Sequence, residues 1–321
     1  MSASWAIGFA DAKKRLDVFL TEKLEGLSRS QAKKQVEAGA YTVNGKVVSG
    51  HHFLKEGDVV AVGAMDGKLP AQDHTRRDRT AARNASVRGS VVLPLEIIKE
   101  TKDWIVVKKP AGVLMHPDHD NPDGTLIDSV MVHAPEVAKI GEDPSRPGIV
   151  SRLDKDVSGL VVIAKTQDAF DDLKKQFAEH SVTKEYVALV HGDVTTDEGD
   201  LKFRISRSTS KARMAASAAN AEGGQAAWTH YAVEKRFTGA ALLRLQILTG
   251  RTHQIRAHLH AFGHPVIGDP LYKLKQTKRN LHAPRVMLQS VKLAFNDPAT
   301  GERVTFEQSL DPEFNALIRD L

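Results

Sequence analysis

Near the middle of the chain, residues 147–165 read PGIVSRLDKDVSGLVVIAK. A proline and a glycine, which favour a turn, lead into a charged loop that carries Arg152 and Asp154. The apolar run 160–164 follows at once and predicts a buried strand. A carboxylate and a guanidinium held where a rigid strand begins form a candidate site. The alternative is a surface salt bridge, which contributes little to stability.

Composition limits the class of protein. The chain has 321 residues, of which 41% are hydrophobic and 26% charged, as in ordinary soluble globular proteins. No run approaches the roughly eighteen apolar residues of a membrane span, and charges interrupt the first twenty positions, so we expect no signal peptide and a cytoplasmic location. The absence of cysteine excludes disulfides and thiolate chemistry. A net charge of +5 is compatible with a polyanionic partner.

The first sixty residues predict a small α+β domain. Residues 11–24 carry apolar side chains at helical spacing. A second helix is predicted from a capping box at Ser28 to the glycine at Gly39. An Asn-Gly pair predicts a hairpin over residues 41–48, and residues 54–62 predict a turn and a strand. From this pattern alone, the domain could simply have a solvated basic face.

The rest of the chain alternates strands with helical segments. Residues 66–90 are poor in apolar side chains and rich in arginine, which predicts a basic flexible linker. Strands begin near Leu95, and residues 168–180 predict an amphipathic helix. Residues 242–260 pass from an alternating strand into a helix. Its histidines predict no metal site, because they fall on different helix faces and no cysteine accompanies them.

The loop at residues 151–160, SRLDKDVSGL, resembles the signature of the RluA-type pseudouridine synthases, commonly written HRLDxxTSGL. Ser151 and Val157 stand where that pattern has histidine and threonine. Further stretches are similar to family motifs and follow in the family's order: KPAGVLMHP at 109–117, KEYVA at 184–188, TGRTHQIRAH at 249–258 and GHPVIGDPLY at 263–272.

This resemblance implies an enzyme that isomerises uridine in RNA to pseudouridine. It implies an α+β catalytic domain over residues 91–321, with a mixed, mostly antiparallel sheet and flanking helices. It also implies that Asp154 is the nucleophile, that the Tyr186 ring stacks on the target uracil, and that Arg251 pairs with the aspartate. Arg152 is expected to fill the space of the extruded base and hold phosphate. No electrons move overall, so we expect no cofactor and no metal.

The N-terminal elements resemble the S-four-type RNA-binding domain, over residues 13–65. The pieces that carry this likeness are RLD at 15–17, SRS at 28–30, VNG at 43–45 and GD at 57–58. Basic side chains give salt-dependent phosphate binding that is nearly blind to sequence. The side chains expected to provide it, in this domain and in a basic patch of the catalytic domain, are Arg29, Lys33, Lys34, Arg207 and Lys211.

The target RNA stays open at this point. An RNA-binding module beside this signature favours large-subunit ribosomal RNA over transfer RNA. A non-catalytic RNA-binding factor for ribosome assembly is the alternative from another class, and an RNA glycosidase that uses Asp154 is a third. Retention of the charged and aromatic site residues argues against the non-catalytic factor, since binding alone needs no carboxylate facing RNA. We expect a monomer whose partner is RNA and not a membrane.

Overall fold

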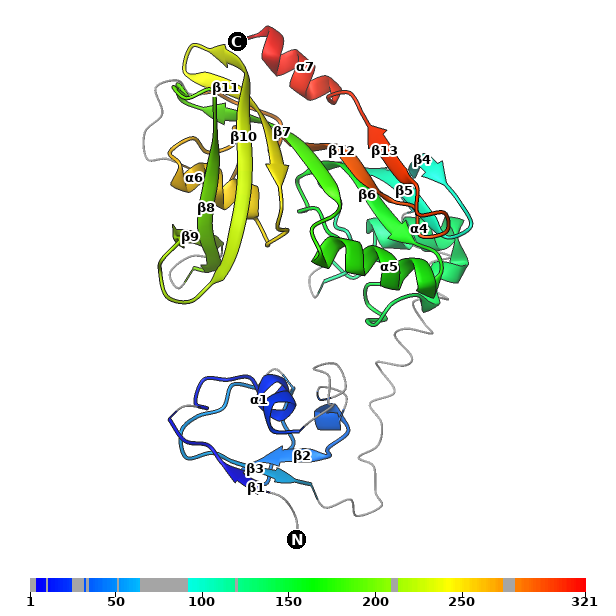
Figure 1. Ribbon diagram of the computed structural model, residues 1–321, viewed down its shortest axis with the longest axis vertical. Helices are drawn as coiled ribbons and strands as arrows, with labels where there is room; N and C mark the ends of the chain where they lie inside the picture. The colour runs from blue at the N-terminus through cyan, green and yellow to red at the C-terminus, as the bar shows by residue number, and fades with distance from the viewer. Residues whose placement is uncertain are drawn as a thin grey trace. The chain divides into compact units, whose positions relative to one another are not determined.

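In the computed structural model the chain forms two units, Met1–Ala85 and Ser86–Leu321 (Figure 1). The predicted linker over residues 66–90 lies outside the residues that the structure describes, as do Arg29, Lys33, Lys34 and Lys211. The described residues are 4–9, 11–24, 32, 35–50, 52–63, 92–118, 121–208, 213–273 and 281–321.

The first unit is a three-stranded antiparallel sheet with the helix α1 (Leu16–Lys23), and the described residues 32 and 35–37 of the predicted second helix are also helical. The helix buries Leu16, Phe19 and Leu20 completely, as their spacing of three and four residues predicts. The predicted hairpin over residues 41–48 does not form as a pair of strands. β2 pairs with β3 instead, and its contact with residues 46–48 is a single bridge between Val43 and Lys46. An unpredicted strand, β1, pairs with the other edge of β3. The strands are β1 (Ser4–Ala6), β2 (Tyr41–Val43) and β3 (Val59–Val62).

Two separate motif pieces of this unit meet at the turn after β2. Asn44 takes the left-handed conformation, with φ of 51°. Its side-chain amide donates to Asp58 at 2.8 Å, and its side-chain oxygen accepts the backbone N–H of Val59 at 2.9 Å. The Val-Asn-Gly and Gly-Asp pieces therefore lock one turn against the start of β3.

The second unit is built on a ten-stranded sheet in the part of the chain described. Its order is β4-β5-β6-β12-β7-β11-β10-β8-β9, and β13 pairs with β12. All pairs are antiparallel except β6 with β12, which confirms the mixed, mostly antiparallel sheet. The strands are β4 (Glu96–Glu100), β5 (Trp104–Lys109), β6 (Ser158–Ala164), β7 (Thr183–His191), β8 (Glu198–Arg207), β9 (Met214–Ala218), β10 (Gln225–Phe237), β11 (Ala240–Ile247), β12 (Leu288–Asn296) and β13 (Arg303–Glu307).

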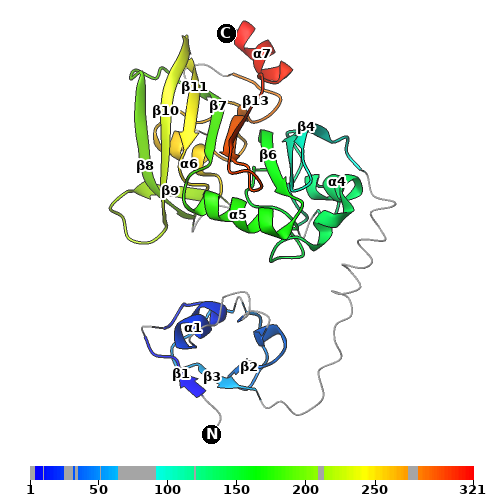
Figure 2. The same ribbon diagram turned by 45° about the vertical axis from the view of Figure 1, so that its right-hand side comes forward.

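Helices cover both faces of β5 and β6. One face packs Val107 and Ile163 against α4, and the other packs Val106 and Val162 against α5. Every residue of β6 is therefore buried, as its continuous apolar run predicts. Figures 1 and 2 show α6 against the strands β8 to β10 and α5 beside β6. The helices are α4 (Leu126–His133), η1 (Pro135–Lys139), α5 (Gln167–Ala178), α6 (Gln254–Ala261) and α7 (Pro312–Arg319).

Strand β12 joins the two halves of the sheet. It pairs in parallel with β6 through Gln289 and Ser290, and with β7 along its other edge. Gly159 lies at this junction with φ of 125°, and a Cβ there would be 2.2 Å from the carbonyl oxygen of Ser290. Only glycine allows this approach. None of the described helices is both long and apolar enough to span a membrane.

Candidate active site

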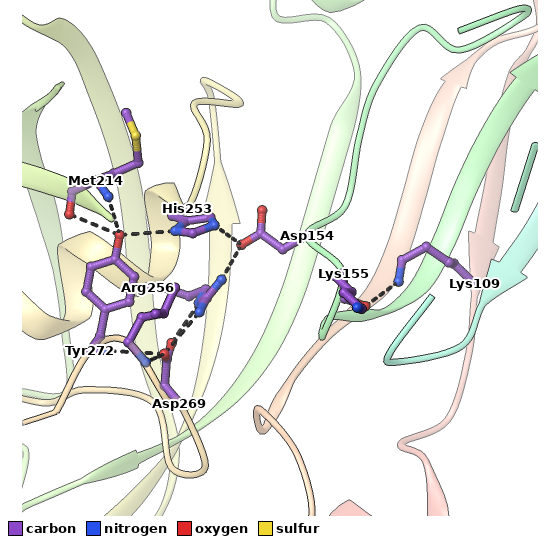
Figure 3. Close-up of polar contacts among 9 residues, drawn as sticks. Lys109, Asp154, Lys155, Met214, His253, Arg256, Asp269 and Tyr272 are labelled. Atoms are coloured by element: carbon purple, nitrogen blue, oxygen red, sulfur yellow. Dashed lines mark hydrogen bonds and ion pairs between the residues drawn. The ribbon is translucent and has the colours of Figure 1, made fainter. Parts of the chain in front are cut away.

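Asp154 lies in the loop before β6, and the buried Lys109 side chain is hydrogen-bonded to the backbone of that loop (Figure 3). The Lys109 ammonium donates to the carbonyl oxygens of Pro110, Val113 and Lys155 at 2.8, 2.7 and 2.9 Å. Burial lowers the pKa of Lys109 to about 7, although the charges of Asp154 and Asp156 oppose this shift. The lysine-proline turn thus fixes the backbone next to Asp154.

Arg256 is the counter-ion of Asp154 (Figure 3). Its Nη1 donates to Asp154 Oδ2 at 3.0 Å, and its Nε and Nη2 donate to the two oxygens of Asp269 at 2.6 and 3.0 Å. The Arg256 side chain is 3% exposed and that of Asp269 0%. Burial opposes the charged form, but the two carboxylates outweigh it and raise the pKa of Arg256 above its usual value. A charged guanidinium therefore stands permanently beside Asp154.

The expectation that Arg251 pairs with Asp154 is wrong. Arg251 is exposed in the turn before α6, where its Nε lies 3.4 Å from the carbonyl oxygen of Ala226. The helix begins only at Gln254, so that Arg256 occupies the buried face of its first turn. Both arginines belong to one motif, and the start of the helix decides which of them points at the aspartate.

His253 completes the surroundings of Asp154 on the helix side (Figure 3). It takes a left-handed conformation with φ of 54°, and its Nε2 lies 4.0 Å from Asp154 Oδ2. Its Nδ1 is 3.2 Å from the hydroxyl of Tyr272, which also bonds to the backbone of Met214. Burial lowers the pKa of His253, although Asp154 opposes that shift. The imidazole is thereby kept as a largely neutral neighbour.

Sequence reasoning did not identify Arg256, Asp269 or His253 as residues of the site. Their signal was present, because Arg256 and His253 lie in the TGRTHQIRAH stretch and Asp269 in the GHPVIGDPLY stretch. Asp269 also accepts the backbone N–H groups of Leu271 and Tyr272 at 2.9 and 3.1 Å. The glycine-rich loop therefore supports the site by holding the second carboxylate of Arg256.

Asp154 opens on a small cavity, called here the aspartate cavity, whose walls include Arg152, Tyr186 and Arg251. The Tyr186 side chain comes from β7 and is 7% exposed. Burial and the charge of Asp154 raise the pKa of Tyr186 above its usual range, so its hydroxyl stays protonated. A neutral aromatic ring beside a carboxylate offers a stacking face to a planar base.

Arg152 stands two residues before Asp154, and its side chain is exposed at the cavity wall. Desolvation, together with the positive charge of Arg146, lowers the pKa of Arg152. Its guanidinium has no hydrogen bond or ion pair with any other described residue. A cation held in this way is free to contact a ligand. Arg207, in contrast, is exposed at the end of β8 and does not line the aspartate cavity.

The two departures from the signature have different surroundings. Val157 is 2% exposed and belongs to the largest apolar cluster of the second unit, where a methyl group suits the site as well as a hydroxyl. Ser151 is partly exposed and lines a cavity next to that of Asp154. Only the departure at Ser151 changes a surface that a ligand can reach.

The histidines of α6 do not form a ligand cluster. Across the described ranges, no group of three or more His, Asp or Glu side chains is gathered for a metal ion. His258 has no exposed surface and packs against the Phe203 ring, with 5.3 Å between the ring centroids. It is a core residue.

Comparisons with known proteins identify the family. Residues 103–261 match the model of the RNA pseudouridylate synthase family, and residues 14–60 match that of the S4 domain. A protein of Synechocystis described as an uncharacterized RNA pseudouridine synthase is 33% identical, over 95% of this chain and 88% of its own. The ribosomal large subunit pseudouridine synthase D of Nitrosomonas europaea is 33% identical, over 95% of this chain and 83% of its own.

A solved structure shares the fold. Human RNA pseudouridylate synthase domain containing 1 superposes with a TM-score of 0.56 and 27% identity, covering 71% of this chain and 89% of its own. The family model and these relatives place the chain among enzymes that modify RNA bases. The chain belongs to the RluA-type family of RNA pseudouridine synthases, which are isomerases, and it carries an S4 domain at its N-terminal end.

Proposed function

We propose that the protein converts uridine to pseudouridine in large-subunit ribosomal RNA, with Asp154 as the nucleophile. The observation that carries this proposal is a chain of two ion pairs beside the Tyr186 ring. Arg256 joins Asp154 to the buried Asp269. The guanidinium holds the Asp154 carboxylate through a 3.0 Å hydrogen bond, at the edge of the cavity that Tyr186 also lines. The carboxylate is thus available for attack.

The reaction is an isomerisation. The bond between N1 of the base and C1′ of the sugar breaks, and a bond between C5 and C1′ forms. The proton at C5 is lost and N1 gains one, so atoms and charge balance without a redox partner. Asp154 assists the cleavage, Tyr186 holds the freed uracil by stacking, and Arg152 occupies the space that the extruded base leaves in the RNA. We expect no cofactor to be needed.

The target is inferred from relatives. Several similar proteins are named ribosomal large subunit pseudouridine synthase D, including those of Nitrosomonas europaea and Pseudomonas aeruginosa. A ribosomal substrate implies action in the cytoplasm. We also propose that the enzyme acts as a monomer. We propose that the S4 domain, residues 13–65, and exposed cations such as Arg207 add affinity for RNA phosphates.

Two experiments test this function. Pseudouridines are mapped in ribosomal and transfer RNA from cells with and without the protein, and we expect a site in large-subunit RNA to be lost. A site lost only in transfer RNA would overturn the target, and no lost site at all would favour a non-catalytic assembly factor. Purified Asp154→Asn is expected to bind RNA but form no pseudouridine, and turnover near that of the unmodified enzyme would refute the nucleophile.

A further inference from the structure

A second cavity, called here the cationic cavity, adjoins the aspartate cavity and has a volume of about 360 Å³. Arg152, Tyr186 and Arg251 belong to the walls of both cavities. Its own walls add Lys184, and none of the residues that line it, all of which the structure describes, is acidic. The cavity thus presents three positive side chains without a matching carboxylate.

Lys184 reaches this cavity because of its place on β7. It precedes Tyr186 by two residues, and side chains two apart on a strand share one face. Its ammonium lies 5.4 Å from the centroid of the Phe177 ring. At Gly250 a Cβ would come within 3.8 Å of Lys184 Nζ, so the turn before α6 passes close to the charge.

Lys184 also differs from the other enclosed lysines of the described chain. Lys109 donates to three carbonyl oxygens, and Lys165 pairs with Glu100 at 2.5 Å. Lys184 has the Phe177 ring as a neighbour but no ion pair with a described residue. Burial lowers the pKa of Lys184 to about 8, which reflects the lack of a compensating charge. The Phe177 ring compensates this charge only in part, whereas an anionic ligand would supply the missing partner.

We propose that the cationic cavity binds a backbone phosphate of the RNA strand next to the target uridine, and that Lys184 is a direct phosphate contact. This inference rests on the proposed function, because it takes the base in the aspartate cavity to be an extruded nucleotide. An extruded nucleotide stays attached to its strand through its phosphates. One of these groups must therefore enter the space beside Asp154, where Arg152, Lys184 and Arg251 converge.

The test measures how RNA affinity depends on salt. Ribosomal RNA from cells that lack the protein is the probe, and the full chain is compared with Lys184→Met. Loss of one charged contact is expected to weaken binding about tenfold. It is also expected to reduce the slope of log affinity against log salt by about 0.7 to 0.9. Lys184→Arg should restore both values to within about twofold of the unmodified chain.

Two controls separate contact from structure. Lys175→Met removes an exposed charge from α5 and should leave the salt slope unchanged. The Lys175 side chain is 70% exposed, and its ammonium lies 4.0 Å from a carboxylate oxygen of Glu179. The thermal unfolding midpoint of Lys184→Met is expected to stay the same or rise, because a poorly solvated charge is removed. An unchanged salt slope would overturn the phosphate site, as would a loss of affinity shared equally by Lys175→Met.

The binding readout is independent of turnover. If Asp154→Asn still formed pseudouridine, the proposed nucleophile would fail while the salt slope still decided the role of Lys184. If Lys184→Met kept the full slope while the unmodified enzyme formed pseudouridine, only the phosphate site would fail.

Discussion

Arg256 has two carboxylates to satisfy, and its removal should therefore affect both folding and chemistry. In Arg256→Gln the buried Asp269 would lose its cation, which we expect to lower the free energy of unfolding by about 3 to 5 kcal/mol. Asp154 would also lose its counter-ion. We expect the single-turnover rate of pseudouridine formation to fall at least about a hundredfold, as for loss of a charge-stabilising group in other active sites.

Arg251→Gln is the matched control for that change. Its side chain is exposed and donates to a carbonyl oxygen 3.4 Å away, with no buried carboxylate to balance, so the free energy of unfolding in urea should be unchanged within about 0.5 kcal/mol. Any effect should be on RNA affinity. Equal losses of stability in the two variants would contradict the assignment of Arg256 as the buried counter-ion.

His258 should make the second unit sensitive to acid. Burial lowers the pKa of His258 to about 4, while an unfolded chain has the ordinary value near 6.5. Between these values the unfolded state binds more protons, so stability falls as the pH falls through this window. The loss amounts to about 3 kcal/mol by pH 4. Urea unfolding between pH 7 and 4 measures it.

His258→Leu fits the same apolar surroundings and cannot titrate. We expect its stability to fall less steeply over that pH window than that of the unmodified chain. Identical pH profiles for the two chains would show that other groups cause the acid sensitivity.

At the level of single residues, the sequence could point to a residue of the cavity where a motif and a strand pattern agreed. Asp154 and Tyr186 line one cavity in the structure, and the sequence could point to both because each is tied to a strand whose alternation or apolar run can be read. Arg256 was missed because α6 follows a left-handed residue at His253. No local pattern predicts that conformation, and the helical phase depends on it.

The junction of β6 with β12 depends on Gly159. In Gly159→Ala the new Cβ would lie 2.2 Å from the Ser290 carbonyl oxygen in a left-handed region of φ. Strain and overpacking together should lower the free energy of unfolding by about 2 to 5 kcal/mol. Urea unfolding measures this, and activity should fall because the same junction positions the Asp154 loop.

Gly301→Ala isolates the backbone part of that cost. Gly301 has φ of 72°, and a Cβ added there would have nothing within 4 Å, so only about 1 to 2 kcal/mol is expected. If the two variants lost equal stability, close packing against Ser290 would not be the cause.

At the level of elements, the strand β6 and the helix after it could be predicted, because apolar runs and helical spacing are local signals. The strands that pair with β6 could not be predicted from local signals. That β6 lies between β5 and β12 follows from contacts with β5, which are 50 to 60 residues apart in the chain, and with β12, which are 131 residues apart. The partner of β2 was missed for a related reason, since the local Asn-Gly turn predicted a hairpin and tertiary pairing with β3 prevailed.

The two units should be separable, since each has an apolar cluster of its own. A chain that lacks residues 1–85 is expected to unfold cooperatively. Its affinity for ribosomal RNA should be weaker, while the rate of pseudouridine formation at saturating RNA should remain within about threefold. Filter binding and single-turnover assays test this, and unchanged affinity would refute a binding role for the first unit.

The site is distributed widely along the chain, and this has a consequence for protein synthesis. Asp154 meets Arg256, which follows it by 102 positions, and β6 is closed by residues 289–290 of β12. Ribosomes add about 5 to 20 residues each second, so a nascent chain carries Asp154 for roughly ten seconds before its partners emerge. Translation thus delivers a finished site only after β12 has left the exit tunnel, and truncated nascent chains cannot act on the RNA around them.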